Sequence, residues 1–392
     1  MNGTKPLTIK YHSLIGRITL PLMHLAFRNV RRNRGAAGVD RQSIAMFERH
    51  LAQNLVALMK HMKSGNFDPK PARRVYVDKG GGKMRPLGIP CVRDRVAQEV
   101  LRQLLSPLFE KLFHQHSYGF RPKRSCHDAL RKVDEWHHDG FRFVLDADIQ
   151  GFFDNIPKDV MMAGLMNVVA DGKVLELVKR FLDAGVMEDG VHYPTTVGTP
   201  QGGVLSPLLA NIALNFLDWQ LEEAGYRFVR YADDFVVLCR SRVRAEEARD
   251  FVEQRISELG LKLSPEKTKV VRFMDGFAFL GFDFTHKARR MRIKSVEKYK
   301  DRIRELTKRS HNLDAKAVEK INSVVRGVAR YFGTTFATVT KQFEKLDIWL
   351  RSRLRSMKFK RKSKNDNFRL KNKHLRRLGL TWLRDFLPAP EG

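Results

Sequence analysis

Three aspartates in two separate stretches of the chain could hold metal ions. Asp148 ends a short apolar run, and Asp233 and Asp234 lie between two β-prone runs, 228–231 and 235–238. Magnesium prefers hard oxygen ligands and keeps substrate phosphate in its coordination shell. Two such ions, about 3.5–4 Å apart, can stabilise the attacking and leaving oxygens of an in-line displacement at phosphorus. If folding brings the two stretches together, these carboxylates could support the transfer of a nucleotidyl group.

The Asp233-Asp234 pair has an ordinary alternative, because adjacent aspartates are common in turns. Here β-branched and aromatic residues flank the pair on both sides, which predicts a tight hairpin with the carboxylates at its tip. Unpaired acids at the ends of buried strands cost free energy unless a cation meets them. Residues 141–149 predict a buried strand that carries Asp148 at its end, and Asp146 on the same strand is a rival ligand.

Apolar spacing and turn signals predict the elements that must position these acids. The chain is helix-rich and mixed to about residue 140, contains helices and strands to about 285, and is helical beyond. We expect helices over residues 11–62, 93–113, 158–182 and 246–259, a helix after the loop that begins at residue 201, and strand pairs within 73–89, 228–238 and 277–284.

The chain carries a large positive charge. Its 392 residues include 73 Lys and Arg but 43 Asp and Glu, a net charge of +30. Such an excess opposes compaction unless a polyanion neutralises it, and nucleic acid is favoured over an anionic membrane surface. No apolar run is long enough to span a bilayer or to act as a signal peptide. Three widely separated cysteines indicate neither a disulfide framework nor a zinc site. We expect a soluble, cytoplasmic protein with no membrane partner.

Much of this charge lies in the last quarter of the sequence. Residues 286–392 hold 31 Lys and Arg against 10 Asp and Glu, and residues 358–364 include five basic side chains. A solvated face or a disordered tail is the ordinary explanation for such a run. Apolar residues at helical spacing argue instead for a folded helical domain with one basic side; they are Phe343, Leu346, Leu350 and Leu354.

Six ordered motifs resemble those of reverse transcriptases, in the form found in group II intron proteins. Residues 231–234 (Tyr-Ala-Asp-Asp) are similar to the Tyr-x-Asp-Asp box, and residues 148–154 resemble the first catalytic motif. The Pro-Gln-Gly motif of the family has its counterpart between them. The remaining matches are residues 85–90, 117–122, 199–208 (the Pro-Gln-Gly segment) and 279–282, the last resembling the primer grip.

The resemblance implies an α+β, right-hand polymerase fold followed by an all-helical thumb and maturase domain. Fingers with a helical N-terminal extension would occupy residues 1–140. A palm with an antiparallel sheet would occupy 141–285, with a helical insertion at 158–195 that partly contributes to the fingers. Residues 286–392 would form the basic helical thumb or maturase-like domain. The chain shows no cysteine pairs of an HNH endonuclease, so it resembles the branch that lacks this domain.

The resemblance also assigns roles around the acidic centre. Asp148 and Asp233 would ligate two Mg²⁺ ions, for which Mn²⁺ can substitute, and Asp234 would support them. The Ile149 carbonyl would face the metal on the nucleotide side. Motif spacing favours Asp148 over Asp146 as the ligand. Asp154, in the same motif, is expected to cap the next helix.

Five further residues would bind the incoming nucleotide. Lys79 and Arg85 flank a glycine-rich turn, where cations could clamp a triphosphate, although such a turn can also be a merely solvated hairpin. Phe153 matches the aromatic residue under the sugar that would exclude a 2′-hydroxyl, with a core phenylalanine as the alternative. Gln201 would pack on the nucleotide and templating base. Lys267 would protonate the leaving pyrophosphate, with Lys269 as a rival.

Template and primer would be held by residues on either side of the palm. Arg121, Lys123 and Arg124 would contact template phosphate, with an ion pair as the alternative. Leu280 and Gly281 lie in the primer-grip-like segment. The basic tail would hold the duplex by its shape and backbone, and this binding should weaken steeply with salt.

The implied function is an RNA-directed DNA polymerase that extends a DNA or RNA primer with dNTPs on an RNA template. Two alternatives stay open. The first is a maturase whose main role is to bind structured group II intron RNA and assist splicing. The second is a polymerase that copies RNA into RNA, which depends on whether Phe153 selects the sugar.

Overall fold

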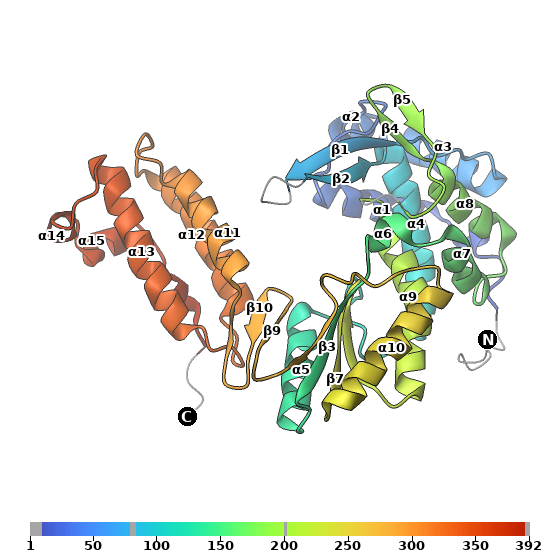
Figure 1. Cartoon of the computed structure of the whole chain (residues 1–392). Helices are drawn as coiled ribbons and strands as arrows, with labels where there is room; N and C mark the ends of the chain where they lie inside the picture. The colour runs from blue at the N-terminus through green and yellow to red at the C-terminus, as the bar shows by residue number, and fades with distance from the viewer. Residues whose placement is uncertain (1–9, 79–83, 200–201, 389–392) are drawn as a thin grey trace. The chain divides into compact units, whose positions relative to one another are not determined.

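The computed structural model describes residues 10–78, 84–199 and 202–388 (Figure 1). The chain forms two compact units: Met1–Val133 with Val144–Val270, and Asp134–Phe143 with Val271–Gly392. The first unit mixes helices and strands, and the second is helical apart from one small sheet. The α+β class with a helical C-terminal region is therefore confirmed. The three-part division with boundaries near residues 140 and 285 stays a prediction.

Four helices build the N-terminal part of the first unit. Their apolar faces meet because residues three or four positions apart lie on one side of a helix; Leu55, Leu58 and Met62 are accordingly buried. Gly65 takes a left-handed conformation (φ +83°) that ends α3, close to the expected end of the helical region at residue 62. The helices are α1 (Leu20–Arg32), α2 (Ile44–Arg49), α3 (Leu51–Ser64) and α4 (Val92–Phe109).

A four-stranded sheet in the order β2-β1-β4-β5 lies next to these helices (Figure 1). The predicted hairpin forms between β1 (Ala72–Asp78) and β2 (Met84–Ile89), with Val77 opposite Arg85. The sequence analysis missed β4 (Val186–Glu188) and β5 (Val191–Tyr193). Each of these strands has only three residues, and neither alternates between buried and less buried positions.

The second sheet of this unit has the order β6-β7-β3-β8. The predicted hairpin is confirmed as β6 (Arg227–Tyr231) paired with β7 (Asp234–Cys239), and the predicted strand before it as β3 (Phe143–Asp148). β7 is apolar and buried after its first residue, as expected of a strand with neighbours on both sides. The fourth strand is β8 (Lys269–Arg272), and the helices α9 (Ser206–Glu223) and α10 (Arg242–Glu258) pack on this sheet and on each other.

The region predicted to be helical over residues 158–182 contains two helices. They are α7 (Lys158–Met166) and α8 (Gly172–Asp183), and Asp171 separates them because its carboxylate accepts hydrogen bonds from the first amides of α8. The capping role predicted for Asp154 is wrong: this residue lies inside the short helix α6 (Phe152–Asn155), and Gly151 and Pro157 occupy the N-cap positions of α6 and α7.

The second unit combines a three-stranded sheet with helices. Strands β9 (Phe277–Phe279), β10 (Phe282–Phe284) and β11 (Arg289–Met291) form it in the order β11-β10-β9, which confirms the predicted strand pair. The apolar stripe predicted at 343–354 is buried inside α13. The helices are α11 (Ile293–Leu306), α12 (Ala315–Phe332), α13 (Thr340–Phe359), α14 (Asp366–Arg369) and α15 (Asn372–Arg377).

Among residues 10–78, 84–199 and 202–388, no helix combines the length and the apolar character needed to cross a membrane.

The start of α12 provides a test of the helical unit. Asp314 accepts a hydrogen bond from the Ala317 amide at 2.7 Å, so Asp314→Ala should lower the free energy of unfolding by about 1 kcal/mol. Asp314→Asn, which keeps an acceptor at the same place, should lose much less. Chemical denaturation of the two variants checks this, and equal stabilities would contradict the cap.

Candidate active site

The tip of the β6–β7 hairpin presents two of the three aspartates. The strands pair up to Tyr231 and Asp234, which leaves Ala232 and Asp233 as a two-residue turn. Ala232 has a φ of +59°, in the left-handed region that two-residue hairpin turns require. The side chain of Asp234 is exposed, whereas Asp233 is half-buried.

Asp148 reaches the same site because β3 lies beside β7 in the sheet. The Lys267 ammonium donates a hydrogen bond to Asp148 Oδ2 at 2.8 Å. This bond is the largest cause that raises the pKa of Lys267, and the charges of the other two aspartates raise it further. One lysine therefore interacts with all three carboxylates, which places them in a single electrostatic neighbourhood.

Burial and a neighbouring negative charge both act on the Asp233 carboxylate. Burial raises its pKa, and the negative charge of Asp148 raises it further. Its own amide N–H, Arg85 and Arg230 act in the opposite direction. A cation bound between Asp148 and Asp233 would offset the free-energy cost of burying the Asp233 charge and the repulsion between the two carboxylates.

The donor set fits Mg²⁺ in its chemistry, since carboxylate oxygens are the ligands this ion prefers. Within the described parts of the chain, no three Asp, Glu, His or Cys side chains already converge as a metal-binding group. Here the hydrogen-bonded partner of Asp148 is Lys267, whose side chain is 63% exposed. The Ile149 backbone forms a bridge to Leu263, held by the Asp148 carbonyl and the Gln150 amide on either side of it.

Two of the residues predicted to bind the nucleotide can be placed beside the acids. Arg85 on β2 lowers the pKa of Asp233 through its charge, so it belongs to this electrostatic neighbourhood. Lys267 contacts Asp148 directly, whereas its rival Lys269 is an exposed residue of β8. Their roles toward a nucleotide stay predictions. Lys79 and Gln201 lie outside the described residues.

Phe153 lies in α6 with its ring almost covered, 9% exposed. It contacts Phe152 and meets the ring of Phe120 edge-on, with centroids 6.5 Å apart. Its carbonyl accepts a hydrogen bond from the amide of Thr199, the first residue of the Pro-Gln-Gly segment. This burial agrees with the core alternative, and the role of Phe153 in sugar selection stays a prediction.

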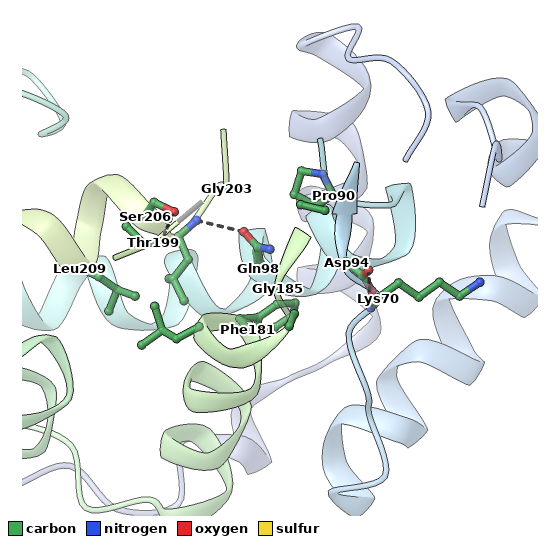
Figure 2. A pocket seen from close by; sticks show the side chains of 14 residues that line it. Lys70, Pro90, Asp94, Gln98, Phe181, Gly185, Thr199, Gly203, Ser206 and Leu209 are labelled. Carbon is green, nitrogen blue, oxygen red and sulfur yellow. Dashed lines mark hydrogen bonds between the residues drawn. The ribbon is translucent and has the colours of Figure 1, made fainter. Parts of the chain in front are cut away.

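A small cavity of about 30 Å³ lies beside the Pro-Gln-Gly segment (Figure 2). From α4, Gln98 Oε1 accepts hydrogen bonds from the amides of Val204 and Leu205. The hydroxyl groups of Thr199 and Ser206 form a hydrogen bond, with 2.7 Å between their oxygens. A space of this size takes one or two water molecules rather than a nucleotide. The hydrogen bonds around it therefore support the conformation of the Pro-Gln-Gly segment.

Gly202 connects this segment to the strand that carries Arg85. With a φ of +113°, a side-chain carbon at Gly202 would lie 2.5 Å from the Gly88 carbonyl oxygen. Only glycine fits such an approach in that backbone conformation. The close packing therefore fixes β2 against the Pro-Gln-Gly segment.

The residues predicted to hold the template have unequal environments. Arg121 is 7% exposed and donates to Glu110 and to the carbonyls of His114 and Ser117, so the ion pair left open by the sequence is present. Arg124 donates to the Gln115 carbonyl. Their contact with template stays a prediction.

Lys123 is exposed, and its binding to template phosphate stays a prediction. Leu280 and Gly281 form the β9–β10 turn of the second unit, with φ values of +46° and +81°. The Leu280 carbonyl accepts from the Tyr331 hydroxyl and the Gly281 carbonyl from Ser295. The part these two residues play in holding a primer also stays a prediction.

Sequence reasoning missed a set of buried polar residues behind the hairpin tip: Asn211, Asp218 and Arg230. The available signal was an arginine within an otherwise apolar run, directly before Tyr231. An arginine buried in such a strand requires a partner, but the sequence does not show that Asp218 on α9 supplies it.

Comparisons with known proteins agree with this geometry. Residues 77–284 match the model of the family "Reverse transcriptase (RNA-dependent DNA polymerase)". The chain belongs to the reverse transcriptase family. Residues 296–379 match "Group II intron, maturase-specific domain", so this is a reverse transcriptase of the group II intron type. The predicted family and fold class are confirmed.

Several curated proteins are similar to this reverse transcriptase. Protein YkfC of Escherichia coli is 34% identical over 295 residues, which cover 64% of this chain and 77% of YkfC. The group II intron-encoded protein LtrA of Lactococcus lactis is 38% identical over 213 residues, or 53% of this chain and 35% of LtrA. An uncharacterized 91 kDa protein in the cob intron of Schizosaccharomyces pombe is 31% identical over 289 residues, 58% of this chain and 36% of that protein. The matches thus span about a third of the length of the last two.

The cavity near Gln98 leads to a prediction about pH. Burial raises the pKa of Asp94 from 3.8 to about 6, so the folded protein holds this proton more tightly than the unfolded chain. The stabilisation is complete below the unfolded pKa and is lost as the pH rises through the folded one; the loss is at most about 3 kcal/mol. Asp94→Asn should therefore gain stability relative to the wild type between pH 4 and 7, measured by urea unfolding. Asp250→Asn, on an exposed helix, is the control, and parallel curves for all three proteins would contradict the assignment.

Proposed function

We propose that this reverse transcriptase copies an RNA template into DNA with two Mg²⁺ ions held by Asp148 and Asp233 and supported by Asp234. The interaction of one lysine with all three carboxylates carries this proposal. The burial of Asp233 supports it as well, because a buried carboxylate beside a second negative charge is stabilised by a bound cation. When bound there, the ions would supply Lewis-acid stabilisation of the attacking and leaving oxygens.

The protein side chains have distinct parts in this proposal. Arg85, whose charge lowers the pKa of Asp233, would pair with the triphosphate of the incoming dNTP. Lys267 is exposed enough to leave Asp148 when metal and nucleotide arrive, and its ammonium could then donate a proton to the departing pyrophosphate. Phe153 would lie under the sugar, and Gln201 beside the base.

Primer extension on an RNA template tests the reaction. Asp233→Asn removes one negative charge and a strong metal ligand, so extension should fall by about a hundredfold or more, which corresponds to about 2.7 kcal/mol of transition-state stabilisation. Binding of the primer–template should change little. Asp250→Asn, a change of equal size on the exposed face of α10, is the matched control. Undiminished extension by Asp233→Asn would exclude the proposed metal ligand.

A second function is favoured by the match of residues 296–379 to the maturase-specific domain. We propose that the second unit also binds structured intron RNA through its excess of basic side chains. Lys358, Lys362 and Lys364 are exposed at the end of α13 and in the segment after it. Such residues are suited to contact phosphate, which makes binding strongly dependent on salt.

Replacing these three lysines by glutamine should weaken RNA binding and reduce the slope of log K against log salt by up to about 3. Fluorescence anisotropy with a labelled group II intron RNA measures the slope. The same change at Lys60 and Lys179, exposed lysines of the first unit, serves as the control. A slope that stays the same would remove these lysines from the interface. A splicing assay with Asp233→Asn separates the two functions, since splicing should survive the loss of polymerisation.

A further inference from the structure

A buried arginine lies directly behind the catalytic hairpin. Arg230 is the penultimate residue of β6 and is 1% exposed. Its guanidinium donates to both carboxylate oxygens of Asp218, at 2.7 and 2.5 Å. Asp218, on α9, is fully buried. A buried, two-pronged pair of this kind has a fixed geometry, because the planar guanidinium matches the carboxylate.

The remaining arm of Arg230 reaches the turn itself. Nη1 donates to the Ala232 carbonyl and to Asn211 Oδ1, both at 2.9 Å. The Ala232 carbonyl belongs to the peptide group that also contains the Asp233 amide. That amide acts on the Asp233 carboxylate and lowers its pKa. Arg230 therefore holds the peptide group that leads into Asp233, and with it the backbone from which the Asp233 side chain extends.

A third contact limits the position of the same turn. Asn211 Nδ2 donates to the Gly119 carbonyl at 2.8 Å, and Gly119 lies against the hairpin tip. A side-chain carbon at Gly119 would approach the Ala232 nitrogen to 2.3 Å. The segment before Gly119 is also joined to β6, since the Arg230 amide donates to His116 and the Arg230 carbonyl accepts from Tyr118. The turn is thus held from behind by Arg230 and from the side by Gly119.

Left-handed backbone costs free energy in a residue other than glycine, and Ala232 has such a conformation. It persists where the surroundings determine it fully. Two contacts to the turn meet this condition: the Arg230 guanidinium, which residues of α9 hold in place, and the 116–119 segment.

We propose that Arg230, held by Asp218 and Asn211, is a positioning residue that fixes the Ala232–Asp233 peptide and thereby orients the Asp233 carboxylate toward metal. This inference rests on the proposed function of Asp233 as a metal ligand. Arg230 itself touches neither substrate nor metal.

Arg230→Lys is the principal variant, because lysine retains the charge but cannot bind Asp218 at two points and also reach the Ala232 carbonyl. Arg180→Lys is the matched control: Arg180 also combines a carboxylate partner, Glu176, with two main-chain carbonyls, of Gly65 and Phe67. Far-UV circular dichroism and thermal unfolding first establish that both variants are folded.

Two measurements follow. Mn²⁺ affinity is determined by electron paramagnetic resonance on the complex with a dideoxy-terminated primer–template and dNTP, in which no turnover occurs. Arg230→Lys should bind Mn²⁺ about fivefold or more weakly. In Mg²⁺-dependent extension its kcat should fall about tenfold or more, with KM for dNTP and primer–template affinity within about threefold of wild type, since misorientation affects the reacting geometry more than binding. Arg180→Lys should match wild type in every parameter.

A folded Arg230→Lys protein with wild-type Mn²⁺ affinity and kcat would overturn the inference. If this variant does not fold, Asn211→Ala decides, because it leaves the Arg230–Asp218 pair intact and removes the link to Gly119. Weaker Mn²⁺ binding by about threefold is then expected, and unchanged affinity would reject the positioning role. Failure of the wild type itself to bind Mn²⁺ or to extend a primer would instead reject the proposed function, so the two outcomes are distinguishable.

Discussion

Repulsion between carboxylates that the fold brings together is the interaction on which the active site depends. Asp148 and Asp233 are 85 residues apart in sequence, yet the negative charge of Asp148 raises the pKa of Asp233. Burial of Asp233 makes this repulsion stronger, since charges interact more strongly away from water. The surrounding residues offset it with cations: Lys267 bonds to Asp148, and Arg85 and Arg230 act on Asp233. A site with this balance is suited to exchange a protein cation for metal and nucleotide.

The sheet and its neighbours make this arrangement rigid. Pairing of β6 with β7 sets the turn, and the placement of β3 beside β7 brings Asp148 to the same end. Behind the turn, the buried Arg230–Asp218 pair connects the sheet to α9. A buried ion pair of this kind is weak evidence for stability. Its value here lies in geometry, because the same guanidinium also reaches the backbone between Ala232 and Asp233.

The sequence predicted those features that depend on local pattern. The Asp-Asp hairpin, the β1–β2 hairpin and the apolar stripe of α13 each follow from short-range periodicity or turn chemistry. Strands β4 and β5 were missed, whereas the equally short β9 and β10 were predicted, because phenylalanine alternates with another residue in β9 and β10. Arg121 could be assigned either to template or to an ion pair, since the sequence does not show that Glu110 lies beside it.

The residues that support the site could not be predicted from the sequence either. Asp218 is separated from Arg230 by a turn and most of a strand, and only the packing of α9 on β6 brings them together. The contact of Gly202 with Gly88 similarly joins two motifs that are 114 residues apart. Motif spacing thus predicted the residues that we propose carry the chemistry, whereas long-range packing determined those that hold them in place.

Anomalous diffraction from Mn²⁺ in crystals of the protein with primer–template and dNTP tests the central claim most directly. The account predicts two manganese peaks about 3.5–4 Å apart, each within coordination distance of a carboxylate oxygen of Asp148 or Asp233, with Lys267 moved away from Asp148. Two ions bound elsewhere, or an Asp148 that keeps its bond to Lys267 while nucleotide is bound, would contradict it.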